Sequence, residues 1–168
     1  AGVSPVSVGG DNIGGTISVK SLPPVFAPAG KGFHTEGSLS ANFRSVNDSI
    51  GGAAALTAAT EAVSLGYTGS WVKARNYYAG GDHTSVHATL YEARNHAATL
   101  AGRKDGHLVA VQGGQQFIPY EGFANARMDL TGNRGRFLNG RYEGDFSWGK
   151  LEAKAYWQFV QHSMDKIN

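Results

Sequence analysis

The residues of this chain that could do chemistry gather towards its C-terminal half. His162, Met164 and Asp165 follow one another closely, and Met128 and Asp129 lie in an earlier segment. Imidazole and thioether groups are soft ligands that suit copper, and imidazole also suits iron or zinc. Met128, Asp129, His162 and Met164 therefore form a candidate metal-ligating set. The alternative for the two methionines is packing within loops.

A second histidine pair, His83 and His87, has a spacing of four residues. Such a pair shares one face only on a helix, whereas the preceding sequence Gly80-Gly81-Asp82 is a turn signal. We therefore interpret both as solvated loop histidines.

Catalytic motifs are missing from the sequence. It contains no G-x-S-x-G elbow, no H-E-x-x-H pair and no phosphate-loop pattern, and it has no cysteine. We therefore expect neither an enzyme nor a bound cofactor.

A candidate ligand-gathering surface lies in the segment IPYEGFANARMDLTGNRG, residues 118–135, which has the composition of an irregular loop. Its aromatic, guanidinium and amide groups are Tyr120, Phe123, Arg127 and Asn133. Binding residues concentrate on loops that a rigid scaffold holds in place. We expect these four to contact a solute, and packing against neighbouring loops is the alternative.

The elements that must position these residues are segments in which apolar and polar side chains alternate, as in residues 62–71. Successive side chains of a strand point to opposite faces, so each segment predicts a sheet with one apolar and one polar surface. Seven strands are expected, at about 33–46, 51–60, 62–78, 88–103, 107–117, 136–146 and 151–159.

The turns between these strands are alternately short and long. Tight turns are expected at 60–61, 104–106 and 147–150, and long connections at 79–87 and 118–135. Outer-membrane barrels have short periplasmic turns and longer extracellular loops, whereas a soluble meander has no reason to send every long loop to one end. The pattern favours an all-β, antiparallel transmembrane barrel over a soluble β-sandwich.

The composition argues against a nucleic-acid-binding protein and against a helical membrane protein. The chain has 168 residues, 24 of them glycine, and a formal net charge of +2, which is too small and too dispersed to indicate nucleic acid as a partner. No segment approaches the roughly 18 consecutive apolar residues of a membrane helix. The opening AGVSPVSVGG is not a secretory signal, so we expect either a mature N-terminus or an internal piece of a longer protein.

The N-terminal residues carry a resemblance to a known family. Asp11–Lys20, DNIGGTISVK, combines a Gly-Gly pair with an alternating I-x-V strand, and Pro23-Pro24 follows it. This stretch resembles the end of the plug domain of the TonB-dependent outer-membrane receptors, just before their barrel begins. Arg136–Gln158 and Gln161–Asp165 are similar to early barrel strands of the same family.

The resemblance implies a domain organisation. Residues 1–22 would be the C-terminal end of the plug, 23–32 a linker, and 33–168 the first strands of the barrel. Such receptors have about 22 strands around a plug, and seven strands cannot close that circle. The chain is therefore expected to be an internal part of a receptor.

The resemblance also implies a function. It predicts energy-coupled import of a scarce solute, an iron-siderophore or another metal chelate, across the bacterial outer membrane. The implied partners are a TonB-type energy transducer whose contact segment is absent from this chain, outer-membrane lipid, and the small-molecule or metal-chelate ligand. A passive porin and a soluble β-sandwich binding module are the alternatives, and the plug-like segment argues against the porin.

Overall fold

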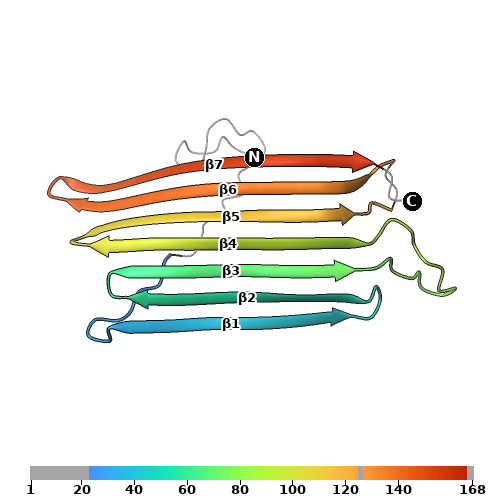
Figure 1. The fold of residues 1–168 in the computed structure, drawn as a ribbon, viewed down its shortest axis with the longest axis horizontal. Coiled ribbons are helices and arrows are strands. Elements are labelled where there is room, and N and C mark those ends of the chain that lie inside the picture. Colours follow the sequence, from blue (N-terminus) through green and yellow to red (C-terminus); the bar gives the residue numbers. More distant parts are fainter. Residues whose placement is uncertain (1–22, 125–126, 166–168) are drawn as a thin grey trace, which may run out of the picture.

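The computed structural model describes residues 23–124 and 127–165, so the predicted plug segment 1–22 lies outside the described residues. The described part forms one seven-stranded antiparallel sheet in which each strand pairs with the next along the chain (Figure 1). Its strands are β1 (Phe33–Arg44), β2 (Ser49–Thr60), β3 (Val63–Ala74), β4 (Tyr91–Lys104), β5 (His107–Glu121), β6 (Asp129–Phe146) and β7 (Gly149–Asp165). No helix in these residues has the length and apolarity needed to cross a membrane.

The strand register sorts the side chains onto two faces, because residues paired directly across an antiparallel ladder lie on the same face. Leu65 pairs with Leu100, which pairs with Val111, and Ser70 pairs with Asn95, which pairs with Gln116. The large side chains of the apolar face are Phe33, Leu39, Phe43, Ile50, Leu56, Val63, Leu65, Tyr67, Trp71, Leu100, Val109, Val111, Leu138, Leu151, Trp157 and Phe159. The polar face carries Ser38, Ser40, Asn42, Thr57, Ser64, Thr68, Ser70, Asn95, Thr99, Gln112, Gln116, Asn133, Asn139, Arg141, Glu143, Glu152, Lys154, Gln158 and His162.

The large apolar side chains are exposed and the core of the sheet is small. Leu39 is 83% exposed, Leu100 57% and Trp157 56%. The buried apolar residues of the described chain are Ala27, Ala59, Ala74, Ala101, Ala110 and Leu130. Leaving a large apolar side chain in water forgoes about 1.5–3 kcal/mol of burial energy. The apolar face therefore requires a cover that this sheet does not supply.

The connections differ at the two ends of the sheet. Figure 1 shows the hairpin turns 61–62, 105–106 and 147–148 at one end, and 45–48, 75–90 and 122–128 at the other. Asp105 and Gly106 have φ values of 50° and 79°, as the two central residues of a type I′ hairpin turn require. The predicted alternation of short and long connections is present, with the second predicted long loop much shorter than expected.

Residues 118–135 are mostly strand, so the expectation of a long irregular segment is wrong. β5 continues to Glu121 and β6 begins at Asp129. The ladder shifts register between Glu92 and Arg94, where Ile118-Pro119 lies opposite one residue of β4. A bulge is a position where a proline fits, because no ladder hydrogen bond is needed there. A second shift, between Leu130 and Gly132, lets β6 pair with β7 as far as Asp165.

The segment that precedes β1 is attached to the end of the sheet with the short turns. The Ala27 N–H donates to the Thr60 carbonyl at 3.0 Å, and Ala27 is fully buried. The Gly30 N–H donates to Glu61 Oε1 at 2.6 Å. The Arg103 guanidinium lies 4.3 Å from the centre of the Phe26 ring. These contacts fix where the chain joins the sheet.

Candidate functional site: a polar row across the sheet

A row of hydrogen-bonded side chains crosses the polar face from β3 to β7, towards the end of the sheet with the long connections. The Asn95 amide donates to Ser70 Oγ at 3.2 Å, and the Gln116 amide donates to Asn95 Oδ1 at 3.0 Å. The Asn133 amide donates to Gln116 Oε1 at 3.3 Å, and His162 Nδ1 lies 3.4 Å from Asn133 Oδ1. We call these five residues the polar row.

The direction of these hydrogen bonds favours one tautomer of a neutral His162 ring. Because the Asn133 nitrogen donates to Gln116, its oxygen is the atom that faces the imidazole. An amide oxygen only accepts, so Nδ1 of the neutral ring carries the proton and Nε2 presents the lone pair. A histidine whose Nδ1–H is held in this way is oriented to ligate through Nε2. The polar row therefore ends on an imidazole whose Nε2 can accept a hydrogen bond or ligate a cation.

Four residues of the polar row, all but His162, line a hollow of about 620 Å³ that follows the sheet. Its lining is largely from the polar face and includes Ser38, Ser40, Thr68, Asn95, Gln116, Asn133 and Gln158. On β2 the lining residues are Ala53, Ala54 and Ala55. Small side chains there leave room, while hydroxyl and amide groups on the other strands supply donors and acceptors for a hydrated or polar solute.

Ion pairs occupy the same face near the short turns. Arg141 contacts Glu143 and lies 3.5 Å from Glu152, which lies 2.8 Å from Lys154. Lys150 lies 3.2 Å from Asp145. The polar face thus changes from neutral amides near the long connections to paired charges near the short turns. Such pairing keeps the face polar with little net charge.

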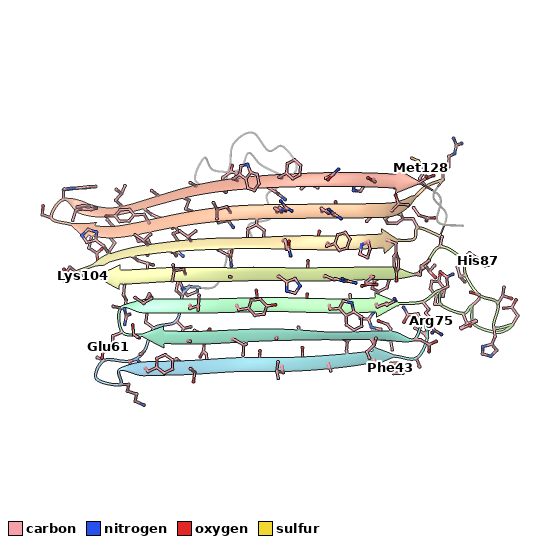
Figure 2. The ribbon with its side chains drawn as sticks, in the orientation of Figure 1. Phe43, Glu61, Arg75, His87, Lys104 and Met128 are labelled. Carbon is pink, nitrogen blue, oxygen red and sulfur yellow. The ribbon has the colours of Figure 1, made fainter. Side chains whose placement is uncertain are left out.

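The structure brings together two of the four candidate metal ligands. His162 and Met164 are two residues apart on β7, so they share the polar face. Asp129 begins β6, is buried, and accepts a hydrogen bond from the Phe123 N–H at 2.9 Å. Met128 is half exposed just before it, at the end that carries the long connections (Figure 2). Within residues 23–124 and 127–165, no group of three or more His, Cys, Asp and Glu is arranged to hold a metal.

The four candidate ligand-gathering residues do not form a single surface. Asn133 lies on the polar face, where it is part of the polar row. Tyr120 lies on the apolar face, and its hydroxyl donates to Glu92 Oε2 at 3.3 Å. Phe123 and the exposed Arg127 lie in the connection 122–128. A solute that contacts Asn133 from the polar face therefore cannot contact Tyr120 from the same side.

Glu92 is the centre of a cluster that sequence reasoning missed. Its side chain is only 6% exposed, although it lies on the apolar face. Its carboxylate accepts from Trp71 Nε1 at 3.2 Å and from Arg94 Nε at 2.9 Å, and Lys73 lies 3.6 Å away. The signal in the sequence was the pair Glu92 and Arg94 at alternate positions of β4, where the pattern calls for apolar residues.

The connection 75–90 is ordered by its own hydrogen bonds. Asn76 Oδ1 accepts from the N–H groups of Thr89 and Leu90 at 2.9 and 3.0 Å. The Thr84 N–H donates to Asp82 at 3.0 Å, and this bond lowers the pKa of the Asp82 carboxyl. His83 and His87 are both exposed in this connection, and Figure 2 shows His87 in the loop beyond the ends of the strands. Their placement agrees with their interpretation as loop histidines.

The comparisons with known proteins bear on the fold. No family model matches the chain, and no curated protein matches it. Among solved structures, it is similar to the copper transporter OprC, with a TM-score of 0.67 and 18% sequence identity. The match covers 79% of this chain and 20% of that one, so the chain spans about a fifth of the length of OprC. The predicted fold class, an all-β antiparallel sheet of the outer-membrane barrel type, is confirmed.

Proposed function

We propose that this chain is part of the wall of an outer-membrane importer, and that a metal ion or metal chelate contacts its polar face. The observation that carries the proposal is the polar row, which ends on His162 with its Nε2 lone pair available and with Met164 on the same face. Imidazole and thioether together favour a soft cation such as copper. The similarity to a structure named as a copper transporter supports the same class of solute.

The exposed apolar face supports the placement in a membrane. Its large side chains form a continuous surface across all seven strands, and the opposite face is polar. Apolar-out and polar-in alternation is what a barrel with a polar interior needs. We place this sheet in the bacterial outer membrane, with the short turns 61–62, 105–106 and 147–148 in the periplasm.

The proposal also includes coupling of import to an energy source. Residues 1–22 would be the end of a plug, 23–32 the linker, and a TonB-type protein the partner that pulls on the plug. The contacts of Ala27 and Gly30 support this arrangement, because they bring the linker to the end of the sheet that would face the periplasm. A passive porin would have the same wall, but its transport would not respond to collapse of the proton gradient. Uptake that persists without a gradient would favour the porin.

The metal site is tested by substitution in the full-length protein. We expect His162→Ala and Met164→Ala each to weaken copper binding at least tenfold in equilibrium titration of the purified protein, and Met128→Ala to weaken it less. His34→Ala is the matched control, because His34 lies on the same face at the far edge of the sheet, near Glu36. Unchanged binding in both the His162 and Met164 variants would place the solute site elsewhere in the receptor.

A further inference from the structure

The apolar face ends abruptly in a patch of basic and polar side chains on β4, β5 and β6. Ala98, Gly113 and Leu138 are paired across these three strands. At the next position on the same face, towards the long connections, the paired residues are His96, Gln115 and Arg136. The following position has Arg94, Phe117 and Arg134. We call the six residues of these last two rows the basic patch.

The arginines of the basic patch differ in how far they are neutralised. Arg94 is bonded to the Glu92 carboxylate. Across the described ranges 23–124 and 127–165, neither Arg134 nor Arg136 has a carboxylate within 4 Å, and both are exposed. Arg134 lies 5.2 Å from the centre of the Phe117 ring, which holds its guanidinium against the sheet. Two cations therefore remain available to an external anion.

The basic patch borders an open hollow. Its volume is about 300 Å³, and its lining includes all six residues of the patch. A guanidinium group recognises a phosphate through two parallel hydrogen bonds. The Gln115 amide adds a further donor at the same rim. The hollow therefore has the size and the donor chemistry for one phosphorylated head group.

We propose that the basic patch binds the phosphate of an anionic membrane lipid, with the acyl chains lying on the apolar face below it. The position of the patch selects a lipid over a soluble phosphate, because an exposed apolar surface that includes Leu138 and Trp157 begins at its edge. The cations of the patch suit the anionic head group of a lipid, and the adjoining apolar surface suits its acyl chains. The proposal goes beyond transport and rests only on the membrane placement proposed above.

The test uses the full-length protein in detergent and compares lipid binding by native mass spectrometry. The probes are lipid A, which bears phosphate, and phosphatidylcholine, whose head group has no net charge. We expect the double variant Arg134→Gln, Arg136→Gln to bind lipid A at least tenfold more weakly and phosphatidylcholine unchanged. Arg44→Gln is the matched control, because Arg44 is a cation at the same end of the sheet but on the polar face.

Three results would overturn the proposal: wild-type lipid A affinity in the double variant, an equal loss in Arg44→Gln, or displacement of lipid A by millimolar inorganic phosphate. The last result would identify a phosphate site instead of a lipid site.

The double variant Arg134→Lys, Arg136→Lys keeps the charge without the paired donors, so we expect it to bind lipid A with intermediate affinity. This variant replaces the glutamine variant in the test if the glutamine variant does not fold. Copper binding should persist in all these variants, because His162 lies on the opposite face. The copper titration of the His162→Ala variant therefore tests the proposed metal site separately from the lipid site.

Discussion

An arginine introduced on the apolar face should destabilise the protein far more than one introduced on the polar face. Leu65 lies in the row that pairs it with Leu100 and Val111. On β4 the same face is apolar between His96 and Lys104. This span is eight residues long, and Leu100 lies at its midpoint. At 3.3 Å per residue this span is about 26 Å along the strand. A strand tilt of about 40° reduces the span to about 20 Å along the membrane normal, close to the ~25 Å apolar band of such barrels.

Leu65→Arg thus places a charge near the middle of the apolar layer. An arginine on the lipid face costs about 2–4 kcal/mol at the bilayer midplane and about 0–1 kcal/mol near the interfaces. We expect about 2–4 kcal/mol of destabilisation for Leu65→Arg, and the same for Ala155→Arg, which lies in the same row through Gly140.

The controls are Thr68→Arg and Gln158→Arg, whose side chains lie on the polar face. The measurement is a denaturant titration of the full-length protein in lipid vesicles, with the change in midpoint converted to free energy through the slope. We expect the control variants to lose less than about 1 kcal/mol. Equal losses on the two faces would refute the assignment of the apolar face to lipid.

Three further predictions concern the ends of the strands. Ala124→Cys should react with an impermeant maleimide on whole cells, whereas Asp105→Cys, in a turn at the opposite end of the sheet, should not; the reverse labelling would invert the orientation. Phe123→Ala combined with Arg127→Ala should weaken solute uptake while the barrel stays folded, because both lie in a connection and not in a strand; unchanged uptake would exclude a role for this connection. Glu92→Gln should lower the free energy of unfolding by about 1–3 kcal/mol, because the buried carboxylate accepts charge-assisted hydrogen bonds; an unchanged denaturation midpoint would contradict that account.

The fold could be predicted from the sequence because successive side chains of a strand point to opposite faces of the sheet. Leu65 and Thr68 lie on opposite faces in the structure, as the alternation required. The extent of β5 and β6 could not be predicted in the same way. Pro119 and Gly132 are strand breakers by type, and only the register shifts beside them let both strands continue.

The candidate site was harder to predict than the fold, because it depends on register between strands distant in sequence. Ser70, Asn95 and Gln116 are each ordinary polar residues of a half-polar strand, and nothing local to any of them indicates a hydrogen-bonded row. Their pairing follows from the lengths of the turns and of the long connection 75–90. The sequence marks His162 by its chemistry, whereas its partner Asn133 lies in a segment whose composition predicts a loop.

The polar row and the basic patch occupy the same level of the sheet on opposite faces. Asn95 of the row lies between Arg94 and His96 of the patch, and Gln116 lies between two patch residues of β5. At this level β4 carries polar side chains on both faces, whereas two residues further along the strand, at Ala97 and Ala98, both faces carry small apolar side chains. A strand that faces lipid carries apolar side chains on that face. In the proposed membrane placement, the polar row would therefore lie where β4 leaves the apolar layer, and a solute held by His162 would be bound at the membrane surface, above the apolar layer that it must cross.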